Sequence, residues 1–188
     1  MATLTSNSSN QLVISAIGSD RPGIVNELSQ LIVQNNGNID DSRMTVLGGE
    51  FAIILLISAT NSELINIEQI INQQASSLAL NITTKQTNNR ALAENTSIEK
   101  KIPYIVEVLA IDNPGIVYKL ADFFSSRDIN IQSLQTDRYS APHTGTQMFA
   151  IEMVIAVPQT VIINDLRDDF LDLCEDMNLD ASIEAPRL

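Results

Sequence analysis

The chain has 188 residues, of which 44% are apolar and 18% are charged, as is typical of a globular protein. Its formal net charge is −12, and its 11 scattered Lys and Arg residues argue against direct nucleic-acid binding, which needs a basic face. No apolar run approaches the roughly 20 residues of a membrane span, and the first residues lack a signal-peptide pattern. We therefore expect a cytoplasmic protein without membrane contact.

Short runs rich in Val and Ile predict four strands in the first half of the chain, at residues 12–17, 38–47, 51–59 and 80–85. Helical spacing of apolar residues predicts one helix that begins at Ile24 and another near 62–78. The second half predicts the same order of elements. Its strands fall at residues 104–111, 130–139, 147–157 and 179–183, with helices from Ile116 and near 160–177.

The two halves are also similar residue by residue. Eight of the 20 residues from Asp20 to Ile39 are identical to those 92 positions later, and the Phe-Ala-Ile of 51–53 recurs 98 positions later at 149–151. The six extra residues fall in a loop at 140–145. The repeated order β-α-β-β-α-β predicts two tandem ferredoxin-like α+β domains, each an antiparallel sheet with helices on one face.

These elements predict the boundaries of the domains. We expect a flexible N-terminus at 1–10, a first domain at 11–86, a polar linker at 87–101 and a second domain at 102–188. The linker is assigned because it is polar and lacks clear periodicity.

One motif, Asp-x-Pro-Gly-Ile-Val, stands between the first strand and the first helix of each copy. Its residues are Asp20, Arg21, Pro22, Gly23, Ile24 and Val25 in the first copy, and Asp112, Asn113, Pro114, Gly115, Ile116 and Val117 in the second. The Asp suits a helix N-cap, the Pro suits the first helical turn, and the Gly leaves that turn open to a close approach. Free N–H groups suit a carboxylate and the Asp suits an ammonium group, so the loop fits a free amino acid. The alternative is that the motif only starts the helix.

The two motifs differ at their second residue. Arg21 either steers an anion or is a solvated charge, and Asn113 either hydrogen-bonds a ligand or favours the turn. The difference argues against two identical ligand sites. It leaves open one sensing copy and one structural copy.

Both motifs are followed by Asn-Ile about 15 residues on, and together these features resemble the ACT domain. The resemblance covers nearly the whole chain, as two tandem copies. It implies amino-acid binding where ACT domains pair, through the strand-to-helix loop and the start of the second strand, and it allows a homodimer. The strand residues of that site are Asn38 and Ile39 in the first copy and Asn130 and Ile131 in the second.

The stretch from Leu12 to Val25 further resembles a bacterial family of tandem-ACT transcriptional repressors of the glycine cleavage system. That resemblance implies a regulator that senses a small amino acid, with glycine favoured, and that acts through a DNA-binding activator as its protein partner. The alternatives are an ACT interaction module that binds no ligand and an enzyme of unknown type.

The remaining reactive side chains predict no catalytic group, no metal site and no cofactor. His143 lies in the loop insertion, where an exposed residue is a simpler interpretation than a pH sensor. Cys174 lies on an apolar helix face and is predicted to be a small core residue. The same helix is crowded with carboxylates, at Asp165, Asp168, Asp169, Asp172, Glu175 and Asp176. They predict a solvated face, with a docking surface for a basic partner as the alternative.

Overall fold

The computed structural model of the protein describes residues 10–87, 101–142 and 144–186. The chain divides into two compact units, Met1–Ser97 and Ile98–Leu188. The predicted flexible N-terminus and linker lie almost wholly outside the described residues, and His143 lies outside them as well. Within the part of the chain that is described, no helix is long and apolar enough to cross a membrane.

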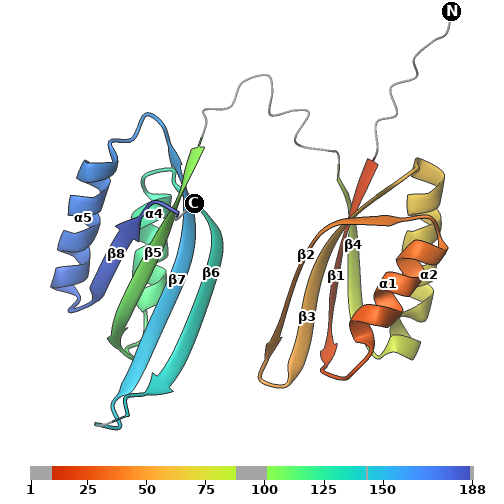
Figure 1. Ribbon diagram of the computed structural model, residues 1–188, viewed down its shortest axis with the longest axis horizontal. Coiled ribbons are helices and arrows are strands. Elements are labelled where there is room, and N and C mark those ends of the chain that lie inside the picture. Colours follow the sequence, from red (N-terminus) through yellow and green to blue (C-terminus); the bar gives the residue numbers. More distant parts are fainter. Residues whose placement is uncertain (1–9, 88–100, 143, 187–188) are drawn as a thin grey trace, which may run out of the picture. The chain divides into compact units, whose positions relative to one another are not determined.

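The first unit has the predicted order of elements. They are β1 (Asn10–Ser19), α1 (Ile24–Gln34), β2 (Asn38–Leu47), β3 (Glu50–Ala59), α2 (Asn61–Leu78) and β4 (Asn81–Thr87). The strands form one antiparallel sheet in the order β2-β3-β1-β4. Both helices cover the same face of this sheet, and the opposite face, the open face, carries no helix (Figure 1).

The second unit repeats this arrangement. Its elements are β5 (Lys101–Ile111), α4 (Ile116–Ser125), β6 (Asn130–Ser140), β7 (Gln147–Pro158), α5 (Ile163–Asp176) and β8 (Asp180–Glu184). The sheet order is β6-β7-β5-β8, again antiparallel throughout. The predicted tandem ferredoxin-like fold is confirmed.

The core of the first unit lies between the sheet and its helices, because side chains alternate between the two faces of a strand. Leu12, Ile14 and Ala16 of β1 face the helices and are fully buried. The helices contribute residues spaced three or four apart, namely Ile24, Leu28, Ile32, Leu64, Ile67 and Ile71. Full burial of each large side chain contributes about 1.5–3 kcal/mol.

The core of the second unit is built on three aromatic rings. Phe123, Phe124 and Phe170 have ring centroids 5.2–5.3 Å apart, a separation at which aromatic pairs attract each other beyond the effect of burial alone. Cys174 belongs to the same buried cluster, and burial raises the pKa of its thiol to about 11. The prediction that Cys174 is a core residue is confirmed, and such a thiol is a poor nucleophile at neutral pH.

The starts of α1 and α4 differ from the sequence prediction. Gly23 and Gly115 are the N-cap residues, with φ of 96° and 93°, and no side chain caps either helix. Asp20 and Asp112 were expected as N-caps but lie three residues earlier, too far back to accept from the first-turn N–H groups. The prolines precede the glycines and so stand outside the first helical turn. The chain needs a left-handed residue to turn from strand into helix, and glycine adopts that conformation without steric cost.

Gly18, near the end of β1, marks a close approach between β1 and the α2–β4 turn. A Cβ there would lie 2.5 Å from the carbonyl oxygen of Ala79 and 2.8 Å from Leu80 Cδ2. We predict that Gly18→Ala lowers the free energy of unfolding by about 1–3 kcal/mol, as overpacking does, in a urea titration. Ser15→Ala on the open face of the same strand is the control, with an expected change below about 0.5 kcal/mol. Unchanged stability in Gly18→Ala would contradict the close approach.

Candidate functional site

Both strand-to-helix loops are fixed to the neighbouring hairpin. The backbone N–H of Asp20 donates to the Gly49 carbonyl and that of Asp112 to the Gln147 carbonyl, both at 3.0 Å. The first intrahelical bonds run from Glu27 to Gly23 and from Lys119 to Gly115. The N–H groups that precede Glu27 and Lys119 in each helix therefore have no partner within it, as at any helix start. Both loops thus have the backbone expected of a carboxylate site.

The structure does not bring all the predicted site residues together within one copy. β1 and β2 are both antiparallel to β3, where Ser19 pairs with Glu50 and Asn38 pairs with Ser58. Eight residues of strand, about 26 Å, therefore separate the Asp20 loop from Asn38. In the second copy, Asn130 and Ile131 lie equally far from the Asp112 loop. No single copy forms the whole of the expected site.

Several predicted site residues pack in or against the hydrophobic cores. Ile24 and Ile116 are buried in the two cores, and Ile39 and Ile131 pack against those cores from the edge strands. The exposed motif residues are Asp20, Pro22, Gly23 and Val25 in the first copy and Asn113, Pro114 and Gly115 in the second, whereas Val117 is partly buried against the core. Apart from Val25 in the first turn of α1, the exposed part of each motif is therefore the loop itself.

A carboxylate that the sequence reasoning missed occupies the start of β2. Asp40 sits in a β-bulge and accepts hydrogen bonds from Gln11, Asn38 and Ser58, at 2.7–3.0 Å. Burial alone would raise the pKa of Asp40, but the three hydrogen bonds together lower it. The side-chain amide of Asn38 is thus already engaged with a neighbour in its own strand.

The first loop is closed by an ion pair. The Arg21 guanidinium binds the Glu27 carboxylate through two nearly parallel hydrogen bonds of 2.6 and 2.7 Å, and it also donates to the Leu78 carbonyl at 3.3 Å. The hydrogen bond from Arg21 lowers the pKa of the Glu27 carboxyl, and the same bond raises the pKa of Arg21. The Arg21 side chain is 38% exposed, so it is a partly solvated charge that is paired with Glu27.

The second loop is open. A cavity of about 490 Å³ lies between the β5–α4 loop and the α5–β8 turn. It is lined by Ile111, Asp112, Asn113, Pro114, Gly115, Ile116, Lys119, Asp176, Met177, Asn178 and Leu179. Lys119 forms no ion pair with any residue that the structure describes. The Asp112 carboxylate, by contrast, pairs with Arg138 of β6.

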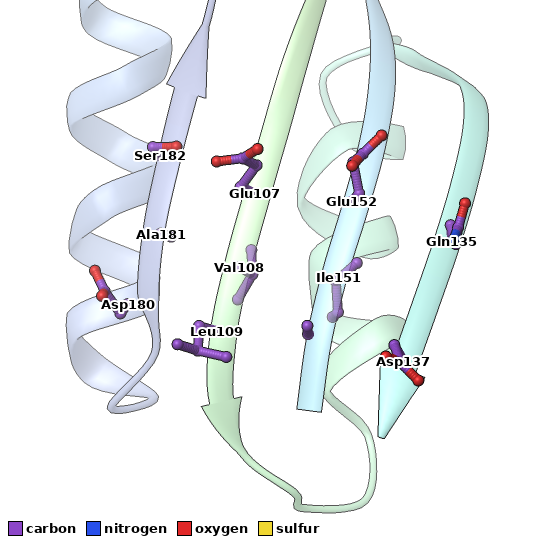
Figure 2. Close-up of a pocket in the computed structure, with 11 residues that line it drawn as sticks. Glu107, Val108, Leu109, Gln135, Asp137, Ile151, Glu152, Asp180, Ala181 and Ser182 are labelled. Carbon is purple, nitrogen blue, oxygen red and sulfur yellow. The ribbon is translucent and has the colours of Figure 1, made fainter. Parts of the chain in front are cut away.

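The open face of the second sheet carries a hollow of about 390 Å³. Its polar lining is dominated by carboxylates from four strands, which we call the acidic face: Glu107, Asp137, Glu152 and Asp180 (Figure 2). Glu107 and Glu152 are directly opposite each other on β5 and β7. Across the described residues there is no group of three or more His, Cys, Asp or Glu side chains placed to hold a metal ion.

The carboxylates of α5 are all exposed, as the sequence predicted for a solvated face. Asp169 pairs with Arg127 at 3.0 Å, and this is an exposed pair.

The ion pair of the first loop predicts a pH dependence. Because the pair lowers the folded-state pKa of Glu27, its contribution to stability is present above the ordinary glutamate pKa of about 4.3. That contribution is lost as the pH falls through the folded-state value. We predict that Arg21→Gln raises the pKa of Glu27 toward its ordinary value in a carboxyl-carbon NMR titration. Arg127→Gln, which removes the partner of Asp169, should leave the pKa of Glu27 unchanged. A Glu27 pKa that is the same with and without Arg21 would contradict the pairing.

Comparison with known proteins shows which proteins the chain is similar to. A model of the ACT domain matches residues 10–85. The glycine cleavage system transcriptional repressor of Escherichia coli strain K12 is 28% identical over 180 residues, which cover 96% of this chain and 92% of that protein. A UPF0237 protein of Methanococcus maripaludis is 32% identical over 79 residues, or 41% of this chain and 88% of the relative.

Solved structures agree along nearly the full length. A protein of unknown function from Galdieria sulphuraria superposes with a TM-score of 0.80 over 95% of this chain and 99% of its own, at 24% identity, which shows the fold. A crystal structure assigned provisionally as a glycine cleavage system transcriptional repressor superposes with a TM-score of 0.68, at 28% identity, over 94% of this chain and 96% of its own. The chain therefore belongs to the ACT-domain family, as a tandem member that resembles the glycine cleavage system transcriptional repressor.

Proposed function

We propose that this protein is an amino-acid-responsive regulator that represses the glycine cleavage system through a DNA-binding protein partner. The observation that carries the ligand half of the proposal is the open second loop, with its cavity and with Lys119, which pairs with no described carboxylate. An α-amino acid carries a carboxylate and an ammonium group at neutral pH. Lys119 complements the first charge, and the carboxylates at the cavity complement the second.

The relatives support the regulatory half of the proposal. The E. coli protein that covers 96% of this chain is a transcriptional repressor of the glycine cleavage system. Glycine is therefore the first ligand to test. The net charge of −12 opposes direct contact with DNA phosphates, so regulation of transcription would pass through another protein.

The acidic face is the surface that we assign to this partner. Like charges directly opposite on neighbouring strands destabilise a sheet, yet Glu107 faces Glu152 and neither forms an ion pair with a residue that the structure describes. The fold does not require these carboxylates, because the first sheet has Ser15 and Ile54 in the same two places. Exposed Ile111 and Tyr139 add apolar area nearby. A partner surface with Lys or Arg side chains would relieve the repulsion and be drawn to the face.

An interaction module without a ligand is the second candidate. The closed first loop favours it, because the Arg21–Glu27 pair occupies a place where the ACT resemblance puts a ligand. The two candidates differ in whether free amino acids bind.

We predict saturable heat when glycine is titrated into the full chain. At 100 times the dissociation constant the ligand should stabilise the protein by about 2.7 kcal/mol, by mass action, which a thermal melt detects. Acetate and glycinamide, each of which lacks one of the two charges, are the controls and should bind at least tenfold more weakly. If none of the common amino acids gives heat or stabilisation, the sensor is wrong and the ligand-free module is favoured.

We predict that the acidic face binds cations that are presented on a peptide. In an amide NMR titration with a hexa-arginine peptide, the largest shifts should fall on β5 and β7. Replacing both central carboxylates, as Glu107→Gln with Glu152→Gln, should weaken binding at least tenfold and raise Tm, because the repulsion is removed.

The matched control for this titration is Asp168→Asn with Asp172→Asn on α5, which changes the net charge equally. It should alter the affinity by less than about twofold. Equal weakening by the two double variants would mean that the peptide senses only net charge, and it would contradict the assignment of the acidic face.

A further inference from the structure

The two Asp-x-Pro-Gly loops share a backbone conformation but not the space beside it. The two glycines have φ values of 96° and 93° and hold the same place before a helix. A Cβ built on Gly23 would meet Glu27 Oε1 at 3.4 Å and the Arg21 guanidinium at 3.9 Å, whereas a Cβ on Gly115 would meet nothing within 4 Å. A Cβ at the first glycine would therefore contact side chains, whereas one at the second would point into open space.

Groups from three parts of the first unit close the first loop. Arg21 belongs to the loop, Glu27 to the first turn of α1, and the Leu78 carbonyl to the last turn of α2. The guanidinium bonds to both partners at once, so it spans the gap between the loop and the end of α2. Fork-shaped Arg–carboxylate contacts of this kind hold a fixed geometry. A ligand at this place would have to displace the pair.

The second copy replaces both members of this ion pair. With the offset of 92, Arg21 corresponds to Asn113 and Glu27 to Lys119. Asn113 is too short to span the same gap, and its neutral amide cannot form an ion pair with Lys119. The place of the guanidinium becomes part of the 490 Å³ cavity, which is within the usual range of about 300–1,000 Å³ for ligand pockets. Lys119 lines it with an unpaired charge.

A second difference between the units lies at the turn before the last strand. Gly18 lets the α2–β4 turn approach β1 so closely that a methyl group would collide with Ala79 and Leu80. The corresponding residue of the second unit is Ala110, whose methyl group is buried. The α5–β8 turn lines the cavity opposite the β5–α4 loop.

We infer that the ligand binds only to the second copy, in this cavity, with its carboxylate on the Lys119 ammonium group. The ligand class is a small zwitterionic amino acid. Asp112 is already paired with Arg138, so Asp176 at the α5 end of the cavity is the carboxylate left for the ligand's ammonium group. The first copy is a structural one whose site is filled by its own side chains. This inference rests on the proposed function and goes beyond it by assigning one copy, one anchor and a stoichiometry of one.

Exchange of the ion pair between the copies tests the inference. Glycine is titrated calorimetrically into the wild-type chain and into two double variants. Asn113→Arg with Lys119→Glu installs the ion pair in the second copy and should weaken binding at least tenfold. Arg21→Asn with Glu27→Lys removes it from the first copy and should keep the original site, with the stoichiometry staying at one or rising to two per chain. Lys119→Gln, a change at an exposed side chain, should weaken binding about tenfold or more without loss of the thermal transition.

The outcomes separate this inference from the proposed function. Two sites per wild-type chain would overturn the single-site inference and leave the sensor intact. The same conclusion would follow if binding were lost from the Arg21→Asn, Glu27→Lys protein and kept in the Asn113→Arg, Lys119→Glu protein. Affinity that is unchanged in Lys119→Gln would overturn Lys119 as the anchor. If neither glycine nor any other common amino acid binds to the folded wild-type chain, the inference and the sensor are both overturned.

Discussion

A left-handed backbone at Gly23 and Gly115 is the constraint on which the rest of the structure depends. It turns each first strand directly into the following helix, with φ of 96° and 93°, which only glycine adopts without steric cost. That turn directs Ile24 and Ile116 into the cores and leaves the preceding loop exposed. The same constraint thus secures the packing of each unit and creates a bare loop beside unpaired backbone N–H groups.

The two loops share this backbone, and their side chains determine whether each loop is open or closed. Arg21 and Glu27 close the first loop, whereas Asn113 and Lys119 leave the second one open. The proposed partner surface is on the second unit too. The turn that lines the cavity ends at Leu179, and the next residue, Asp180, belongs to the acidic face. A ligand that moves this turn would therefore have a direct route to the docking surface, as a coupled pair of sites requires.

The sequence predicted the fold well because periodicity and repetition are local signals. Among the described residues, the eight strands and four helices fall close to the expected positions, and Cys174 is buried as predicted. The helix caps were wrong, because Asp20 and Asp112 are common capping residues and sequence alone does not reveal the positive φ that moved the cap to glycine. The candidate site was harder to predict from the sequence than the helix caps. The partnership of Arg21 with Glu27 depends on side-chain direction, and the facing of Glu107 and Glu152 depends on strand register across 45 residues.

In the regulator that we propose, the second copy senses an amino acid and the first copy is closed by its own ion pair. A crystal structure of the full chain grown with saturating glycine tests it most directly. We expect ligand density between Lys119 and the α5–β8 turn, with the Arg21–Glu27 pair intact in the first copy. Density beside the first loop with that pair broken, and an empty second loop, would contradict it.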